Sequence, residues 1–131
     1  MSKVFDEIKI VDLDVEKTRP SNEASGLRHM FLKLSAFPTN EWVQIFQSER
    51  SFPRHTMWRH AWIEGQYIVV DCVPEEIERY HLKDLKEDVA STNAKYVSYL
   101  QRMEAENERQ QKQEAVEREK LANLKGKLKF D

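Results

Sequence analysis

One stretch of this sequence, from Pro74 to about Leu128, favours a single long helix. The run Val73-Pro74-Glu75-Glu76 is typical of a helix start, because proline is tolerated in the first turn and carboxylates meet the positive end of the helix dipole. No proline follows it, and the next glycine is Gly126. At about 1.5 Å per residue, about fifty helical residues would extend roughly 75 Å, far beyond a domain of this size. We therefore expect a long, protruding C-terminal helix.

The two halves of this stretch differ in chemistry. From Ile77 to Met103, residues of a buried stripe recur every three or four positions: Ile77, His81, Leu85, Val89, Thr92, Tyr96, Leu100 and Met103. From Glu104 to Glu114 nothing larger than alanine is apolar. The sequence thus predicts one folded domain over residues 1–103, which includes the first half of the helix. Residues 104–131 are predicted to form a charged helical or partly disordered tail.

Two strands and a short helix are predicted before residue 51. Residues 3–15 favour a strand with blurred alternation, and its acidic residues are typical of a charged edge strand. Residues 18–26 form a polar loop by composition. Residues 27–36 alternate more clearly, which predicts a second strand. A helix with Thr39 or Asn40 as its cap then extends to about Arg50, with an apolar face of Trp42, Val43, Ile45 and Phe46.

Residues 57–72 predict a β-hairpin, because two apolar runs are separated by Glu64-Gly65 and glycine tolerates a positive φ. This turn would pair Ile63 with Gln66. One face would carry Met57, Arg59, Ala61, Ile63, Ile68, Val70 and Cys72, and the other Trp58, His60, Trp62, Tyr67, Val69 and Asp71. A strand with one face in solvent alternates between apolar and polar residues, and these two runs do not. Both faces of the hairpin therefore need to be covered by other groups. The aromatic face could be covered by the short helix, a second copy of the chain or a ligand.

These elements occur in the order strand, strand, helix, strand, strand, long helix (ββαββα). We therefore expect an α+β fold, with a small antiparallel sheet of about four strands, one short helix and the long C-terminal helix.

Composition narrows the classes of partner and compartment. The formal net charge of -2 gives no general reason to expect nucleic acid or an anionic membrane. Cys72 is the only cysteine, so neither an internal disulfide nor a cysteine-based zinc site is possible. The N-terminal residues do not resemble a signal peptide, and no apolar run is long enough to cross a bilayer. We expect a cytoplasmic protein without a membrane partner.

A basic and aromatic cluster follows the short helix: Arg50, Arg54, His55, Trp58, Arg59, His60 and Trp62. Aromatic rings stack on bases and arginines bind phosphates, so the cluster suggests a surface for nucleic acid or a nucleotide. Two features oppose this reading. Glu41, Glu49 and Glu64 cancel much of the charge, and alternation places Arg59 away from the tryptophans. Buried packing and a protein interface are the alternatives, since Trp, Tyr and Arg are enriched at interfaces.

Catalytic and metal sites have little support in the sequence. His60 and Asp71 share a predicted face within hydrogen-bond reach, but no nucleophile accompanies them, so a structural hydrogen bond is the favoured interpretation. The histidines show no metal-ligand spacing. Three glycines cannot form a Gly-rich dinucleotide or phosphate loop. We expect no enzyme activity, no cofactor and no metal.

The tail contains one further candidate site. Glu108–Lys112 and Glu114–Arg118 are favourable i,i+4 pairs, typical of a solvated helix or a weak coiled coil. A regular coiled coil needs apolar core positions, which Glu104 to Glu114 lack. Leu121, Leu124 and Leu128 restore a short apolar stripe among lysines. This end is either a docking peptide for an acidic groove or a disordered terminus.

Together these features favour a non-catalytic protein-interaction or regulatory protein. Its expected contact surfaces are the aromatic hairpin face, with Trp58, His60, Trp62, Tyr67, Arg50 and Arg54, and the long helix. Its expected partner is another protein or a second copy in a homodimer or larger homo-oligomer. The alternative is a nucleic-acid or nucleotide-binding protein that uses the patch around residues 50–62.

Overall fold

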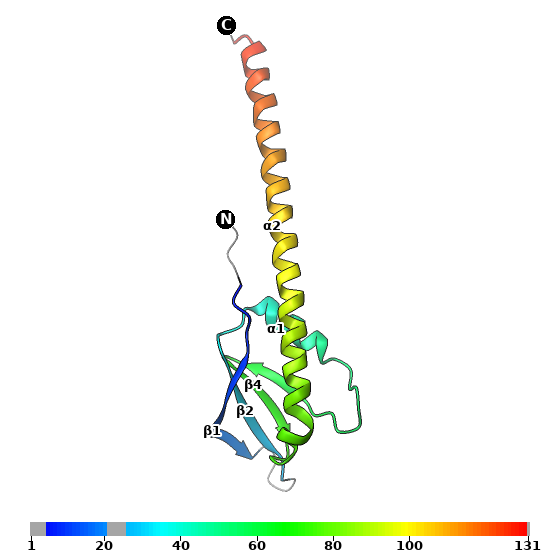
Figure 1. The fold of residues 1–131 in the computed structure, drawn as a ribbon. Helices are drawn as coiled ribbons and strands as arrows, with labels where there is room; N and C mark the ends of the chain where they lie inside the picture. Colours follow the sequence, from blue (N-terminus) through cyan, green and yellow to red (C-terminus); the bar gives the residue numbers. More distant parts are fainter. Residues whose placement is uncertain (1–4, 21–25, 131) are drawn as a thin grey trace. The chain divides into compact units, whose positions relative to one another are not determined.

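The computed structural model of the chain describes residues 5–20 and 26–130. Its elements are β1 (Ile10–Pro20), β2 (Arg28–Leu34), α1 (Asn40–Glu49), β3 (Ala61–Glu64), β4 (Tyr67–Cys72), the π-helical turn η1 (Ile77–His81) and α2 (Leu82–Lys127) (Figure 1). In the described part of the chain, the strands form one antiparallel sheet in the order β1-β2-β4-β3. The predicted α+β fold is therefore confirmed, including its single short helix and its long C-terminal helix.

The core lies on one face of this sheet. Alternate residues of β2 and β4 on that face are at most 5% exposed: Met30, Leu32, Leu34, Ile68, Val70 and Cys72. The first turns of α2 lie across the sheet in Figure 1 and add Leu85 and Val89 to the core. Helix α1 adds Trp42 and Phe46, whose rings stack 5.6 Å apart. Thr39 caps α1, as predicted, by accepting a hydrogen bond from the Trp42 backbone N–H.

Asn93 of α2 joins three segments inside this core. Its Oδ1 accepts hydrogen bonds from the indole N–H of Trp42 at 2.9 Å and from the backbone N–H of Ile8 at 3.2 Å. Its Nδ2 donates to the Ile8 carbonyl at 2.8 Å. Since Asn93 is 4% exposed, these bonds satisfy a polar side chain that would otherwise be costly to bury. They fix α2 against α1 and against the segment before β1.

Strand β1 differs from its predicted limits. It begins at Ile10 and ends at Pro20, whereas residues 3–15 were predicted. The register with β2 shifts between Asp14 and Arg19, because Asp14 accepts hydrogen bonds from the Lys17 backbone N–H and the Thr18 hydroxyl. The strand bulges there and rejoins β2, so the predicted loop begins later than residue 18. Residues 3, 4 and 21–25 lie outside the described residues. The prediction that β1 is an edge strand is confirmed.

The hairpin forms, but the predicted pairing of Ile63 with Gln66 is wrong. Ile63 pairs with Ile68 and Glu64 with Tyr67, so the turn lies at Gly65 and Gln66, with Gly65 at a φ of 57°. The predicted partner of each residue is thus displaced by two positions. Because side chains alternate with a period of two, this error leaves the side chains of β3 and β4 on their predicted faces.

The strand predicted from Met57 begins only at Ala61. One ladder hydrogen bond continues before it, from the Asp71 N–H to the His60 carbonyl at 3.0 Å. The Arg59 carbonyl instead accepts from the guanidinium of Arg50, so Trp58 and His60 belong to a loop that follows α1.

The long helix begins two residues later than predicted. Pro74 and Glu75 form a turn, and Glu76 is the first helical residue. The wider turn of η1, with its i→i+5 bonds, brings His81 to 3.0 Å from the Glu76 carboxylate. Helix α2 then continues to Lys127. Its buried stripe ends at Tyr96, not at Met103, whose side chain is 52% exposed.

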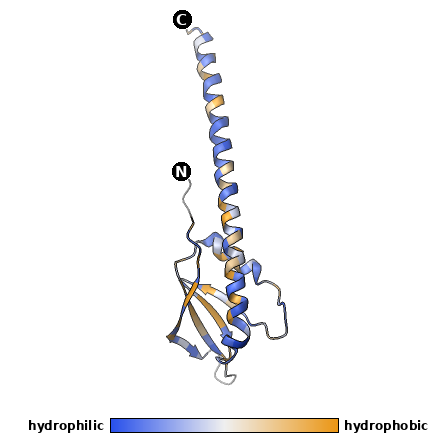
Figure 2. Cartoon of the chain, viewed as in Figure 1, coloured by the Kyte–Doolittle hydropathy of each residue, from blue (hydrophilic) through white to orange (hydrophobic). Residues whose placement is uncertain are grey.

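The chain divides into two compact units, and α2 contributes to both. One contains the described residues up to Tyr96, and the other contains Val97 and the residues that follow it. In the second unit every described residue from Gln101 onward is exposed, and hydrophilic residues predominate (Figure 2). The predicted boundary between a folded domain and a charged tail, after Met103, is based on the loss of apolar residues there and stays a prediction. Within the described residues, neither helix contains a stretch apolar enough to span a bilayer.

Candidate functional site

Arg50 and Arg54, two of the predicted site residues, meet on one carboxylate. Arg50 lies 2.6 Å from Asp88 of α2, and Arg54 lies 2.5 Å from the other oxygen of the same side chain. Both guanidinium groups also lie over the ring of Trp58, at 3.9 and 4.6 Å from its centroid. We call this group the arginine clamp: Arg50, Arg54, Trp58 and Asp88.

Burial decides the chemistry of the arginine clamp. The side chains of Asp88 and Arg50 are 1% and 5% exposed, whereas Arg54 is 45% exposed. Burial lowers the pKa of the Arg50 guanidinium, and the hydrogen bond to Asp88 opposes that shift. A buried carboxylate is tolerated only when cations and hydrogen bonds compensate for its lost hydration. The two arginines therefore compensate the charge of Asp88, which leaves little net positive charge there for an external phosphate.

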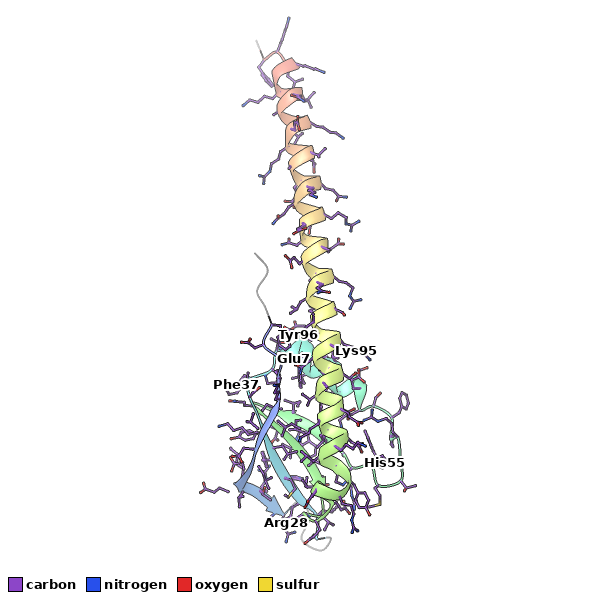
Figure 3. The ribbon with its side chains drawn as sticks, viewed as in Figure 1. Glu7, Arg28, Phe37, His55, Lys95 and Tyr96 are labelled. Carbon is purple, nitrogen blue, oxygen red and sulfur yellow. The ribbon has the colours of Figure 1, made fainter. Side chains whose placement is uncertain are left out.

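His55 extends the same side of the molecule. It lies on the loop after α1, beside the first turns of α2 (Figure 3), with its Nε2 2.5 Å from the Asp84 carboxylate. Its ring also meets that of Trp58 edge-on at 5.4 Å. Loop residues 54–58 are thus attached to α2 by two carboxylates, one turn apart.

Arg59 points away from the tryptophans, toward the start of the long helix. Its guanidinium forms two parallel hydrogen bonds with Glu76, at 3.0 and 3.1 Å, and His81 contacts the same carboxylate. The bonds from Arg59 lower the pKa of Glu76 to about 2, with a smaller contribution from His81. Burial raises the pKa of the nearby Cys72 thiol to about 12. Cys72 therefore stays protonated at neutral pH, and a protonated thiol is a weak nucleophile.

The sheet face opposite the core carries aromatic and ionisable side chains in rows. We call it the aromatic sheet face, and it contains His29 and Phe31 of β2, Trp62 of β3, Tyr67, Val69 and Asp71 of β4, and His60. The ladder sets His29 beside Asp71 and Phe31 beside Val69, which in turn lies beside Trp62. An apolar row is thereby flanked by a row of ionisable groups.

Trp62 organises this face through its neighbours. His60 stacks on it at 5.0 Å, and His29 meets it edge-on at 5.2 Å. The predicted side-chain hydrogen bond between His60 and Asp71 is wrong, because the ring of His60 stacks on Trp62 instead. The imidazole nearest to Asp71 is that of His29, at 3.9 Å, which is too long for a hydrogen bond.

Two polar atoms on this face are buried without a hydrogen-bond partner among the described residues. They are Nδ1 of His29 and Oδ1 of Asp71. The side chains that carry them remain 25% and 29% exposed, so this row still meets solvent. Sequence reasoning missed His29, and only the pairing of β2 with β4 brings it to this row.

Strand β1 covers the other end of the face. Lys17 lies over the rings of Phe31 and Tyr67, and Arg19 lies 4.9 Å over Phe31, which is 3% exposed. The hydroxyl of Tyr67 donates to Asp14 at 3.1 Å. The bulge in β1 therefore turns cationic stems over the aromatic row. Trp58, Trp62 and Tyr67 remain half-buried, neither closed in the core nor bare.

A cavity of about 400 Å³ adjoins this face at the edge strand β3. Its walls are the end of α1 and the loop before β3, with Gln47, Arg50, Ser51, Trp58, His60, Ala61 and Trp62. Four of the six hairpin-site residues predicted from the sequence line it. Tyr67 and Arg54 do not.

The predicted tail site lies in the second unit. The side chains of Leu121, Leu124 and Leu128 are 56%, 50% and 49% exposed. The first two belong to α2 and Leu128 follows its last turn, so the stripe begins on the helix, ends just beyond it and is open to solvent.

A metal site is the remaining chemical possibility. Among residues 5–20 and 26–130, no three His, Cys, Asp or Glu side chains come close enough to hold a metal ion. Sequence reasoning missed Asp88 and Asn93, which organise the packing of α2. A polar residue within an apolar pattern does not indicate which distant residue it will contact.

Comparison with protein-family models, curated proteins and solved structures finds no match.

Proposed function

We propose that this chain is a non-catalytic protein-interaction or regulatory protein. It binds a protein partner through the aromatic sheet face and through the exposed second half of α2. The observation that carries the proposal is that Trp62 and Tyr67 stay half-buried on a sheet whose other face is closed by the core. Large aromatic side chains in this state bury much area on binding at little entropic cost.

The polar groups of the aromatic sheet face support a protein partner. His29 and Asp71 each have a buried atom without a hydrogen-bond partner in the described residues. Those two atoms are themselves enclosed, but the side chains that carry them are 25% and 29% exposed, so a partner can supply donors and acceptors to their outer polar atoms. A polypeptide offers both kinds of group along its backbone. Its side chains can add contacts with the rings of Trp62 and His60.

Nucleic acid is the alternative, and the geometry supports it less. Arg50 and Arg54, which would bind phosphates, compensate the buried Asp88. The face keeps Lys17 and Arg19, but Asp14 and Asp71 lie among the same residues. A surface of mixed sign lacks the positive field that nucleic-acid binding needs.

We also propose a reducing, cytoplasmic setting. The single thiol, Cys72, is buried and protonated, so it needs no oxidising compartment for stability.

The test is partner capture by three versions of the immobilised full chain. These are the wild type, the double variant Trp62→Ala/Tyr67→Ala, and Phe52→Ala as a matched control, since Phe52 is 79% exposed outside the aromatic sheet face. A specific partner should be retained by the wild type and the control and lost by the double variant. Hydrogen exchange should show the bound partner protecting β2 and β4. Equal retention by all three versions would contradict the proposal.

The same variants separate the alternative. A labelled single-stranded oligonucleotide is titrated into the wild type at low and moderate salt. Steeply salt-dependent binding that the double variant loses would favour nucleic acid over protein as the partner.

A further inference from the structure

We infer that residues 100–124 of α2 pair with the same residues of a second copy of this chain, in antiparallel orientation. This inference rests on the proposed function, since it takes the second half of α2 as an interaction surface and names its partner. From Gln101 onward that surface is exposed along its whole length. It therefore has no partner within the described residues of its own chain.

One stripe of this helix has the spacing of a coiled-coil seam. Its members follow each other by alternate steps of three and four residues: Leu100, Met103, Asn107, Gln110, Glu114, Glu117, Leu121 and Leu124. These steps define the a and d positions that face a partner helix. The seam is apolar at both ends and polar in the middle, and this pattern of apolar and polar positions is symmetric about Lys112, with amides on one side of the centre and carboxylates on the other. A seam with that symmetry matches itself when one copy is reversed.

Reversal gives each seam residue a suitable neighbour. Leu100 meets Leu124 of the partner subunit, and Met103 meets Leu121 of the partner subunit. In the middle, the Glu114 carboxylate meets the side-chain amide of Gln110 of the partner subunit, which can donate a hydrogen bond to it. In the same way, Glu117 meets Asn107 of the partner subunit. Every layer is thus either apolar or a carboxylate matched with an amide.

A parallel, in-register pair would be poor by comparison. Glu114 would face Glu114 of the partner subunit, and Glu117 would face Glu117 of the partner subunit. Like carboxylates brought together in a partly desolvated seam repel each other strongly. The seam therefore selects the antiparallel orientation.

The residues that flank the seam select the same orientation. The flanking e and g positions are acidic in the first part, neutral in the centre and basic in the last part: Glu104, Glu106, Gln111, Gln113, Arg118, Lys120, Lys125 and Lys127. In the antiparallel pair, Glu104 lies beside Arg118 of the partner subunit and Glu106 beside Lys120 of the partner subunit. The parallel pair would instead set Lys120 beside Lys125 of the partner subunit.

Forming the contacts between chains requires the loss of few contacts within each chain. Glu106 pairs with Arg109 one turn away, but both side chains are more than half exposed, so that pair contributes little and can be exchanged. The four polar layers weaken the seam while fixing its register. The product is a two-fold symmetric dimer that dissociates reversibly on dilution.

Orientation is tested with engineered cysteines in the full chain. Met103→Cys and Leu121→Cys are made as separate variants and mixed under mild oxidation. The antiparallel pair predicts a disulfide between one Met103→Cys chain and one Leu121→Cys chain, and none in Met103→Cys alone. The wild type is the control, since Cys72 is buried. A disulfide within Met103→Cys alone, as a parallel pair would form, overturns the inference.

Strength and specificity are tested by sedimentation over a range of concentrations. Glu104→Lys/Glu106→Lys should raise the dimer dissociation constant at least about tenfold, because four favourable pairs become repulsive. Mixing this variant with Arg118→Glu/Lys120→Glu should restore a heterodimer, since the four charged flanking pairs are then all of opposite sign. Glu108→Lys/Glu119→Lys, at positions outside the seam, is the matched control and should leave dimerisation unchanged.

A wild-type chain that stays monomeric at all concentrations, or an equal loss in the control variant, overturns the inference. Neither result touches the proposed function if the chain still captures a partner that Trp62→Ala/Tyr67→Ala loses. Conversely, Trp62→Ala/Tyr67→Ala should leave the sedimentation profile of the dimer unchanged.

Discussion

The two halves of α2 share one helix and differ in what their side chains contact. In the first half, residues 82–96, six side chains are buried, and three of them, Asp88, Thr92 and Asn93, are polar. Residues 101–127 of the second half are all exposed. The first half is held by tertiary contacts, whereas the second depends on intrinsic propensity and on local pairs such as Glu106–Arg109.

The comparison indicates which half of α2 contributes to the free energy of unfolding. Helix propensity contributes only tenths of a kcal/mol per residue, while burial of a single leucine contributes about 2 kcal/mol. Substitutions in the first half should therefore change the free energy of unfolding. Matched substitutions in the second half should leave it unchanged and act only on association between chains.

The largest effect is expected for Asp88→Ala. The change leaves the buried Arg50 guanidinium without its carboxylate, and breaking a buried ion pair from one side costs about 3–5 kcal/mol. Chemical denaturation followed by tryptophan fluorescence measures the loss. Glu108→Ala in the exposed half is the control and should change the free energy of unfolding by less than about 0.5 kcal/mol. Equal stability of the two variants would mean that the arginine clamp adds nothing.

A leucine pair isolates packing from charge. Leu85 is fully buried, so Leu85→Ala should cost about 2–5 kcal/mol through lost transfer energy and a residual cavity. Leu124 lies in the same helix and is 50% exposed, so Leu124→Ala should change the free energy of unfolding by less than about 0.5 kcal/mol. The measurement is made at low protein concentration, where chains do not associate. A large cost for Leu124→Ala under those conditions would show that the second half contributes to folding.

A smaller, pH-dependent effect is expected at Glu76, where the helix begins. Its pKa is about 2 in the folded chain against an ordinary value of 4.5, so its contacts with Arg59 and His81 stabilise the fold above pH 4.5. That contribution falls as the pH is lowered from about 4.5 to about 2, because the folded state must then be protonated. We expect about 1–2 kcal/mol at neutral pH, less than the full shift implies, since solvent screens the partly exposed Arg59.

Glu76→Gln measures this contribution by difference. The gap in unfolding free energy between wild type and variant should be widest near neutral pH and close toward pH 2. Glu75→Gln, whose side chain is exposed, is the control and should show no such closing gap. A gap that stays constant with pH would assign the loss to something other than the carboxylate charge.

The fold follows from the sequence to the extent that it depends on periodicity. The apolar runs predict four strands and two helices in the right order, because period-two and period-3.6 patterns reflect burial directly. The faces of the hairpin survive an error of two positions in its pairing, since alternation is insensitive to that shift. The limits of β1 and β3 are wrong, because a bulge at Asp14 and the contacts of Arg59 override local propensity.

The candidate site was less accessible to sequence reasoning. Trp62 and His60 were identified because large rings on a hairpin require a cover. Arg50 and Arg54 converge on Asp88, which follows them in the sequence by 38 and 34 positions, respectively. No local sequence pattern encodes contacts over such separations. His29 reaches the same face only through the ladder between β2 and β4. Charge compensation between distant elements is a property of the folded chain.

The smallest effect on folding is expected for Gln110→Pro, which sharpens the comparison most. Proline in a helix interior removes a hydrogen bond and costs about 3 kcal/mol or more where the helix is coupled to the fold. Gln110 lies in the exposed half, so the helix should break locally, seen as a loss of helical circular dichroism, while the thermal midpoint of the dilute chain stays unchanged. Ala90→Pro, also at an exposed position but beside the buried Val89, should unfold the domain or lower its midpoint steeply. If both prolines lower the midpoint equally, the two halves of α2 fold as one unit, and the exposed half is more than a surface for association.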